Sequence, residues 1–337
     1  MSSAFGRPIN EVRERVGDLH QVLRVDQFVE DDGPARGTRR IRLVNGGGIE
    51  IDVHPDRAMD LGQVTVGGIP VAWISPVGVT SPHFYEPEGT RWLRTYTGGL
   101  MALCGLDAYG PPSEDDGVAY GLHGRIGATP AHITGVESSA DGVAVSGTVR
   151  QVSVFGEHLV LRRRISSAAG SDTFVLEDSV TNEGFAATPH MVLYHVNLGW
   201  PLVDEHTVVD IPSTSMRARD AEAEKGLDDA LRLLPPTPGF QEQVFHHGFA
   251  AGEDPTVRVS NPQVGVELEM TFSRETLPFL VQWKMMGQGH YALGIEPTNV
   301  DSLAGRAGAR AQGLVPVLEP GQRVDYRLQF RLRRTTA

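Results

Sequence analysis

The side chain that most strongly suggests chemistry is the carboxylate of Glu296. Alternation along its segment puts Ala292 and Gly294 on the same face as Glu296, so the carboxylate is given space instead of cover. A partly desolvated glutamate has a raised pKa, which a general base near neutral pH requires. The alternative, an edge glutamate that faces solvent, describes Glu267 and Glu269 better. We therefore interpret Glu296 as a candidate catalytic group.

Two histidines stand in unusual local surroundings. His195 follows two apolar residues on one face of a strand-like segment, so its imidazole enters the interior and needs a polar partner. His123 lies between glycines, which leave a side chain uncovered and let the backbone approach a ligand closely. The alternatives are a satisfied core histidine at 195 and an ordinary turn residue at 123.

An arginine and a tryptophan complete the candidates from local pattern. Arg57 follows the strand-like segment 49–53, where its rigid donor fork could bind an anionic or hydroxyl-rich group. A structural pair with Asp56 or Asp60 describes the same stretch equally well. Trp92 lies in a loop region rich in glycine and aromatic residues, which could form a stacking wall for a sugar ring or simply anchor the loop.

The elements that must position these residues are predicted to be strands. Strict period-two alternation marks 264–272 and 324–332 as half-buried strands, and further candidates are 39–44, 49–53, 62–66, 143–152, 158–165, 173–180, 190–197, 279–285 and 290–296. Many short strands without alternating helices indicate a mainly β protein, a large antiparallel sandwich with one or two short helices. We expect helix in fewer than about a fifth of residues, against a usual share near a third.

The helix candidates lie at two places. Apolar residues at steps of three and four, with Asn10 as a possible N-cap, predict a helical N-terminal extension over about residues 8–27. A weaker, acidic and Ala-rich candidate runs from about 217 to 234 and ends at the proline-rich stretch 235–239, which we interpret as a surface loop. The sequence shows no repeat, and we expect a single domain over 1–337.

Composition excludes several classes of function. The 337 residues contain 30 Lys and Arg against 42 Asp and Glu, a formal charge of −12, which argues against nucleic-acid binding. No apolar run approaches the ~20 residues of a membrane helix, and the first residues do not form a signal peptide, so we expect a cytoplasmic protein. The single cysteine, Cys104, excludes an intrachain disulfide and a multi-thiolate metal site.

Taken in order, the candidates resemble the galactose mutarotase-like (aldose 1-epimerase) superfamily, and within it a branch whose members mostly lack an assigned function. The resemblance covers about residues 40–333: Arg57 near an early strand, His123 in a His-Gly motif, His195 near Asn197, and a late Glu296 before proline. It implies the antiparallel supersandwich of that superfamily. It also implies an isomerase of carbohydrate metabolism that interconverts sugar anomers.

The resemblance also implies roles for these residues. Glu296 would take the proton of the anomeric hydroxyl and His195 would protonate the ring oxygen, so that the ring opens and closes from the other face. His123 and Arg57 would bind the sugar, the partner would be a small carbohydrate, and neither a metal nor another cofactor would be needed. A homodimer is compatible with this.

The sequence departs from the superfamily in its expected recognition residues. The stretch 243–248 lacks the aspartate that holds sugar hydroxyls and offers His246 instead. On the segment 279–285, Gln282 and Lys284 share a face, where Lys284 could meet an acidic or oxidised sugar. With Trp92 and Asn197, these side chains complete the expected substrate-binding set.

Two alternatives stay open at this point. The first is a carbohydrate-binding protein without turnover, which a separation of Glu296 and His195 beyond about one sugar ring would favour. The second is a metal-assisted isomerase or lyase that acts on an oxidised sugar. Its ligands would be three of a set of imidazoles and carboxylates: His123, His195, Glu205, His246 and Glu296.

Overall fold

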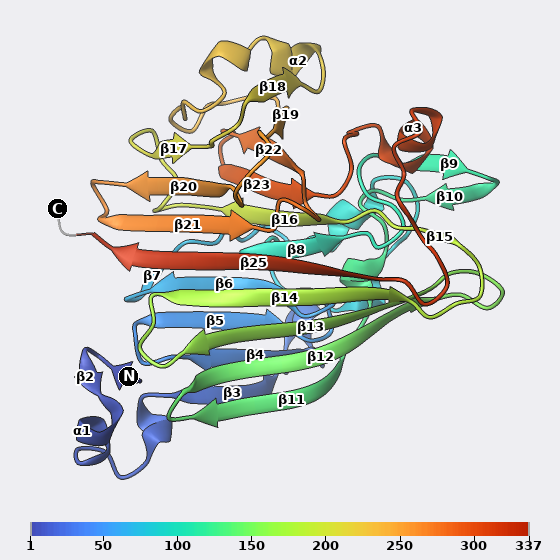
Figure 1. Ribbon diagram of the computed structural model, residues 1–337. Coiled ribbons are helices and arrows are strands. Elements are labelled where there is room, and N and C mark those ends of the chain that lie inside the picture. The colour runs from blue at the N-terminus through green and yellow to red at the C-terminus, as the bar shows by residue number, and fades with distance from the viewer. Residues whose placement is uncertain (1, 336–337) are drawn as a thin grey trace.

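Two large antiparallel sheets stacked face to face form the body of the protein in the computed structural model, which describes residues 2–335 (Figure 1). Strands make up 45% and helices 10%, so both the predicted mainly β class and the predicted low helix content are confirmed. The smaller sheet has the order β11 (His132–Ser139), β12 (Gly142–Val152), β13 (His158–Ala168), β14 (Thr173–Asn182), β25 (Arg323–Arg334), β21 (Val266–Phe272), β20 (Thr256–Asn261) and β17 (Val208–Asp210).

The larger sheet supplies the floor of the site. Its order is β18 (Ser215–Ala218), β19 (Gln243–Gly248), β22 (Phe279–Met285), β23 (Ala292–Thr298), β16 (Leu193–Leu198), β8 (Met101–Cys104), β6 (Asp60–Val66), β5 (Ile49–His54), β4 (Arg39–Val44) and β3 (Arg24–Val29), with β7 (Ile69–Pro70) beside β6. Three two-stranded ribbons lie outside the large sheets: β1 (Ser3–Ala4) with β2 (Arg7–Pro8), β9 (Ser113–Asp115) with β10 (Val118–Tyr120), and β15 (Thr188–Pro189) with β24 (Val317–Leu318).

The predicted N-terminal helix over about residues 8–27 is realised only in part. Helix α1 spans Ile9–Arg13, a 3₁₀ turn covers Leu19–Gln21, and β3 already begins at Arg24. Asp18 accepts a hydrogen bond from a backbone N–H of the 3₁₀ turn and thereby starts a new element, which interrupts the helical path. Pro8, not Asn10, occupies the N-cap position of α1.

The second helix candidate is also shorter than predicted, and a third helix was missed. Residues 215–218 pair as β18, α2 spans Ala221–Glu224 with Asp220 as its N-cap, and a 3₁₀ turn follows at Leu227–Asp229. Helix α3, Gly305–Ala311, contains two glycines that weaken its signal in the sequence.

The main hydrophobic core lies between the two sheets, and a second apolar cluster covers the opposite face of the larger sheet. On β16, Tyr194 and Val196 belong to the main core, whereas Leu193 belongs to the second cluster. Odd-numbered residues of β16 therefore face away from the sandwich interior. His195 shares the face of Met191 and Leu193 as predicted, but this face is covered by the second apolar cluster and is not the sandwich interior that the sequence suggested.

A buried ion pair within the smaller sheet also holds the turn between β5 and β6 of the larger sheet. Arg163 on β13 donates to Asp178 on β14 at 2.8 and 2.6 Å, and its other nitrogen donates to the carbonyl oxygens of Ala58 and Met59. Ala58 and Met59 both have positive φ, at 52° and 59°, so the guanidinium holds a strained turn. Removing one member of such a pair leaves an uncompensated buried charge.

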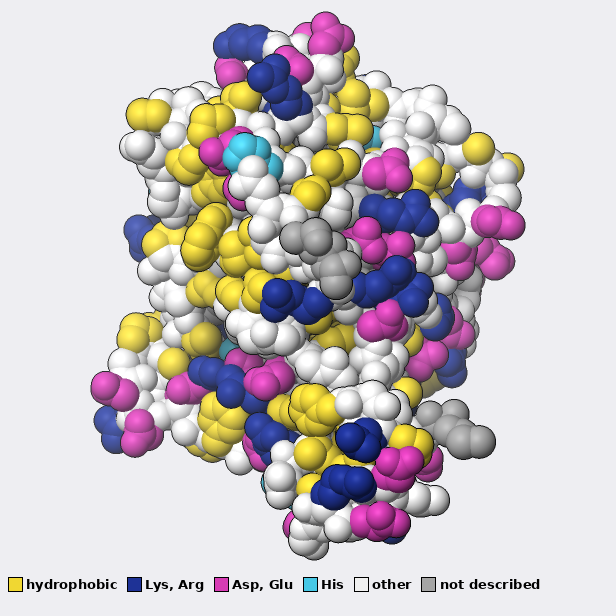
Figure 2. All heavy atoms as spheres, turned by 90° about the vertical axis from the view of Figure 1, so that its left-hand side faces the viewer, with side chains coloured by type: hydrophobic (Ala, Val, Ile, Leu, Met, Phe, Trp, Pro, Cys, Tyr) yellow, Lys and Arg dark blue, Asp and Glu magenta, His cyan; other side chains and the backbone are white. Residues whose placement is uncertain are grey.

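The face toward the viewer in Figure 2 carries positive and negative side chains close together, with hydrophobic side chains between them. Such pairing recurs on the outer face of the smaller sheet, where Arg331 contacts Asp172 and Arg258 contacts Glu269. Within residues 2–335, no helix combines the length and apolar character that crossing a membrane requires.

Candidate functional site

One register row of the larger sheet brings the predicted acid–base residues together. Val281 on β22 pairs with Glu296 on β23, and the pairing of β16 with β23 and β8 places His195 beside Glu296 on one side and Ala102 on the other. All of these side chains stand on the face opposite the main core. His195 and Glu296, about a hundred positions apart in the sequence, thus become neighbours because strand spacing is only about 5 Å.

A cavity of about 400 Å³ lies over this row, within the range of small-molecule sites. Its walls are largely aromatic: Trp92 stacks on Tyr96 with ring centroids 4.1 Å apart, and Trp92 lies 4.8 Å from the His123 ring. The His195 ring lies edge-on to His123 at 5.4 Å and to Trp283 at 5.6 Å. His195, His123, Glu296 and Trp92 therefore line one cavity.

Asn197 fixes the tautomer of His195. The Asn197 amide nitrogen donates to the carbonyl oxygens of Gly99 and His195, which can only accept, so its Oδ1 must face the imidazole. Oδ1 accepts from Tyr96 Oη at 2.7 Å and from His195 Nδ1 at 2.6 Å, which places the proton of neutral His195 on Nδ1. Nε2 then carries the free lone pair.

The Glu296 carboxyl contacts His195 directly. Its Oε1 lies 3.3 Å from His195 Nδ1, so the separation does not exceed one sugar ring. The carboxyl lies over Gly294, where an added Cβ would come within 2.4 Å of Oε1. The interpretation that Gly294 clears space for the carboxylate therefore agrees with the geometry.

Burial sets the protonation of this pair. Desolvation raises the pKa of Glu296 well above its usual range, with a further increase from Glu242, whereas Arg219 acts in the opposite direction. Desolvation lowers the pKa of His195 to about 4, against a smaller opposing effect of its hydrogen bond to Asn197. Burial therefore favours the protonated form of Glu296 and the neutral form of His195.

Two buried polar atoms of the cavity residues have no hydrogen-bond partner among the described residues: Glu296 Oε1 and His123 Nδ1. Buried polar atoms are almost always bonded, so such atoms indicate a place that water or a ligand fills. Both belong to residues that line the same cavity. This is the expected condition of a site that binds hydroxyl groups.

His123 reaches the cavity from a tightly held loop. Its φ is +60°, an uncommon conformation for a residue other than glycine. Its backbone N–H donates to Gly110 O at 3.0 Å, and an added Cβ at Gly124 would come within 2.4 Å of Ala108 O. The flanking glycine thus lets two parts of the chain approach each other and does not face a ligand.

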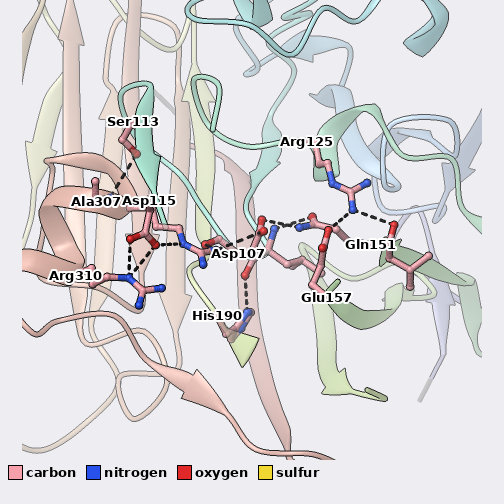
Figure 3. A network of polar contacts seen from close by, with 12 residues as sticks. Asp107, Ser113, Asp115, Arg125, Gln151, Glu157, His190, Ala307 and Arg310 are labelled. Carbon is pink, nitrogen blue, oxygen red and sulfur yellow. Dashed lines mark hydrogen bonds and ion pairs between the residues drawn. The ribbon is translucent and has the colours of Figure 1, made fainter. Parts of the chain in front are cut away.

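A polar network anchors the loop region that carries His123 (Figure 3). On one side Gln151 of β12 donates to Asp107 at 2.6 Å and Arg125 contacts Glu157. On the other side Asp115 accepts hydrogen bonds from arginines of α3 at 2.7 and 2.8 Å. The imidazole is therefore presented by a rigid support despite lying outside regular secondary structure.

The rim of the cavity is polar but already paired. Arg219 Nη2 lies 2.9 Å from Glu242 Oε1, and Arg219 Nε donates to Asp220 at 2.7 Å. Glu242 also accepts a hydrogen bond from Trp283 Nε1 at 2.9 Å. Since the Trp283 ring packs against His195, Glu242 holds one wall of the cavity in place.

Five of the residues expected to bind substrate do not line the cavity. Gln282 and Lys284 lie on the opposite face of β22, where Gln282 donates to Ala230 O and Lys284 donates to Asp229 O. Like Leu280 of the main core, they are even-numbered residues of β22 and share its face, whereas the odd-numbered Val281 and Trp283 face the cavity. The suggested contact of Lys284 with an acidic sugar therefore has no support in this arrangement.

The remaining three lie near the cavity but outside its lining. Arg57 is buried and contacts Thr80 O at 3.4 Å, without an ion pair to Asp56 or Asp60 within the described chain. Asn197 supports His195 from behind. His246 stands on the cavity-side face of β19 but its Nε2 lies 3.2 Å from Asp301 at the sheet edge. We therefore do not count Arg57, Asn197 and His246 among the residues that would contact a ligand in the cavity.

Sequence reasoning missed several lining residues, among them Tyr109, Trp283, Arg219 and Glu242. For Trp283 the sequence holds a partial signal: alternation puts it on the face of Val281 and opposite Leu280. Which of these two faces lines the cavity is decided by tertiary packing. Arg219 and Glu242 flank the Pro-rich loop on either side, and nothing in the local pattern connects them.

The donors of the metal-assisted alternative are not assembled into a site. Among residues 2–335, no group of three or more His, Cys, Asp or Glu side chains is arranged to hold a metal ion. Of the five residues named for this alternative, His195, His123 and Glu296 line the aromatic cavity, whereas His246 lies at the sheet edge.

Comparison with protein families decides the relationship. Residues 35–332 match the family described as "Domain of unknown function (DUF4432)", which is most of the chain. The chain belongs to this family. No curated protein matches this DUF4432 member.

Solved structures place the DUF4432 chain in the galactose mutarotase-like superfamily, as the resemblance implied. A protein from Klebsiella pneumoniae that bears the provisional name aldose 1-epimerase is 27% identical, with a TM-score of 0.85 over 91% of this chain and 83% of that one. A galactose mutarotase-like protein from Clostridium acetobutylicum (13% identity, TM-score 0.67, coverage 94% and 100%) and galactose 1-epimerase from Lactobacillus acidophilus (13%, 0.59, 93% and 100%) share the fold.

Proposed function

We propose that this protein is an isomerase that interconverts the anomers of a free sugar, with Glu296 and His195 as its acid–base pair. The observation that carries the proposal is the contact of these two side chains on the floor of an aromatic cavity. Glu296 Oε1 lies 3.3 Å from His195 Nδ1, and no group of the described residues makes a hydrogen bond to it. The name of the Klebsiella protein supports it. Stacking on aromatic rings suits the C–H faces of a sugar.

The favoured protonation suggests how the pair works in ring opening. Protonated Glu296 gives its proton to the ring oxygen, while the free Nε2 of His195 takes the proton of the anomeric hydroxyl. The bond between C1 and the ring oxygen breaks, and the aldehyde forms between a carboxylate and an imidazolium. The resemblance implied the opposite roles, with Glu296 as the base and His195 as the acid. The total number of protons on the two side chains is the same in both schemes.

Closure then completes the exchange. Rotation about the C1–C2 bond turns the other face of the aldehyde toward the hydroxyl that was the ring oxygen. As the ring closes, Glu296 recovers that hydroxyl proton and His195 returns its proton to the carbonyl oxygen, so the pair ends as it began. The aromatic rings of Trp92 and Trp283 line the cavity, and this apolar surrounding strengthens the electrostatic contacts to the charges of the open state.

His123 contributes binding in this scheme. Desolvation lowers the pKa of His123 to about 3, so it is neutral and can donate or accept one hydrogen bond. Its unpartnered Nδ1 can meet a sugar hydroxyl and thereby orient the ring over the pair.

Exchange between anomers tests the proposal. The purified protein is added to a panel of free aldoses, and two-dimensional NMR exchange measures the interconversion of the two anomeric signals. We expect acceleration over buffer that is proportional to protein concentration for at least one sugar. If sugars raise the melting temperature but no exchange is accelerated, a binding protein without turnover replaces the isomerase.

A further inference from the structure

Away from the acid–base pair, the cavity floor is aliphatic. Val281 is the direct register partner of Glu296, and Val244 stands one strand further from the pair. Leu193 precedes His195 on the same face of β16. Val244, Val281 and Leu193 are 5%, 3% and 1% exposed, and all three line the cavity that contains Glu296, with Val281 directly beside it.

Apart from the unpartnered Glu296 Oε1 and His123 Nδ1, the tyrosine hydroxyls and the charged side chains at the rim are already bonded within the protein. Tyr109 Oη bonds to Val300 O and to Thr298, and Tyr96 Oη bonds to Asn197. At the rim, Arg219 and Glu242 bond to each other. A sugar hydroxyl pressed against the valines would therefore lose its hydration without gaining a partner.

The cavity also lacks a free positive charge for an anionic sugar. Arg219, the cation in its lining, is shared by the carboxylates of Glu242 and Asp220. Lys284 lies on the far face of the sheet and donates to Asp229 O. A phosphate or carboxylate on the substrate would meet Glu242 and Glu296 without a cation to compensate it.

We infer that the substrate is a neutral deoxy sugar, in which hydrogen or a methyl group replaces a hydroxyl where the ring meets Val281 and Val244. This inference rests on the proposed function and specifies its substrate class. A hydrophobic wall rejects an added hydroxyl by about 10- to 100-fold, which sets the scale of the preference.

Matched pairs of sugars test the inference. Exchange between anomers is measured for glucose against 2-deoxyglucose and 6-deoxyglucose, and for galactose against 2-deoxygalactose and 6-deoxygalactose, with glucose 6-phosphate and glucuronate as charged probes. We expect kcat/KM for at least one deoxy sugar to exceed that of its parent by about tenfold or more. A preference for the 6-deoxy sugar places the ring oxygen toward Glu296, because C6 is attached to the carbon beside that oxygen. A preference for the 2-deoxy sugar places the anomeric oxygen there, because C2 is bonded to C1.

A variant connects the preference to the wall. Val281→Thr adds one hydroxyl at nearly constant shape and should reduce the ratio of deoxy to parent sugar several-fold, with Val244→Thr as a second variant. Val136→Thr on β11, 38% exposed and far from the cavity, is the matched control and should keep the parent ratio.

The possible failures are distinguishable. If no sugar is exchanged faster than in buffer, the proposed isomerase is refuted, and this inference with it. If exchange is accelerated but parent hexoses equal or exceed their deoxy partners, or a charged probe is the best substrate, only the deoxy-sugar inference is refuted. Unchanged ratios in both valine variants would refute the role of the wall.

Discussion

Acidification should destabilise this protein steeply, because five buried histidines and the half-buried His123 are held neutral. Burial lowers the pKa to about 4 for five of them and to about 3 for the sixth; they are His54, His190, His195, His246, His247 and His123. The folded-state pKa lies below the unfolded value of 6.5. Between pH 6.5 and about 4 the unfolded chain therefore binds more protons, and stability is lost as pH falls through this window.

The magnitude follows from the shifts. A histidine whose pKa falls from 6.5 to about 4 on folding loses about 1.3 kcal/mol of stabilisation between pH 7.5 and 5.5, so six lose about 8 kcal/mol. Two carboxyls act in the opposite direction. Burial raises the pKa of Asp60 to about 7, which offsets about 2 kcal/mol, and it raises the pKa of Glu296 as well. We expect a net loss of at most about 6 kcal/mol, reduced further by Glu296, which is a large part of a typical domain's stability.

Urea unfolding at pH 7.5, 6.5 and 5.5, followed by tryptophan fluorescence, measures this loss. Replacing the buried His247 by asparagine should reduce the dependence of the unfolding free energy on pH by about one proton. Replacing the exposed Val154 by asparagine changes no titratable group, so it is the control and should leave the dependence unchanged. An unfolding free energy that stays constant or increases from pH 7.5 to 5.5 would refute the reasoning.

Three substitutions test the supports of the site and the core. Gly294→Ala should lower kcat at least tenfold, because the new Cβ would lie 2.4 Å from Glu296 Oε1; a parental exchange rate would contradict the packing described. Asn197→Ala should lower kcat more than it raises KM, because His195 loses the acceptor that fixes its tautomer, and an unchanged kcat would show that the tautomer is set elsewhere. Arg163→Met should cost about 3–5 kcal/mol in urea unfolding by leaving a buried carboxylate unpaired, so a loss below 1 kcal/mol would contradict this.

The sequence predicted the strands well because most alternate between a core face and another environment. The predicted ranges 39–44 and 279–285 match β4 and β22, and the face of His195 and Glu296 follows from the same period. The same alternation could not exclude Gln282 and Lys284 from the site, since Leu280 and Val281 are both apolar and either could have faced the core. Tertiary pairing, which the local pattern does not contain, decides between the two faces.

The loops of the site could not be predicted in the same way. His123 reaches the cavity through a backbone held by contacts with Gly110, and the partners of this loop come from β12 and α3. Gly124 beside His123 was expected to let the backbone approach a ligand. The close approach that it permits is instead to another part of the chain, at Ala108. The prediction of one N-terminal helix was wrong in its length. The helical spacing of apolar residues continues across Asp18, but the chain begins a new 3₁₀ turn there.

The most direct test of the central claim is the exchange rate of Glu296→Gln. On the best sugar found for the parent, this variant should lose about 10²–10⁴-fold in kcat, the usual contribution of general acid–base catalysis, because the amide cannot give or take the proton. Sugar binding, measured as the rise in melting temperature, should survive. Glu267→Gln on the outer face of β21 is the matched control and should exchange like the parent. A Glu296→Gln protein that exchanges anomers as fast as the parent would contradict the assignment of the acid–base pair.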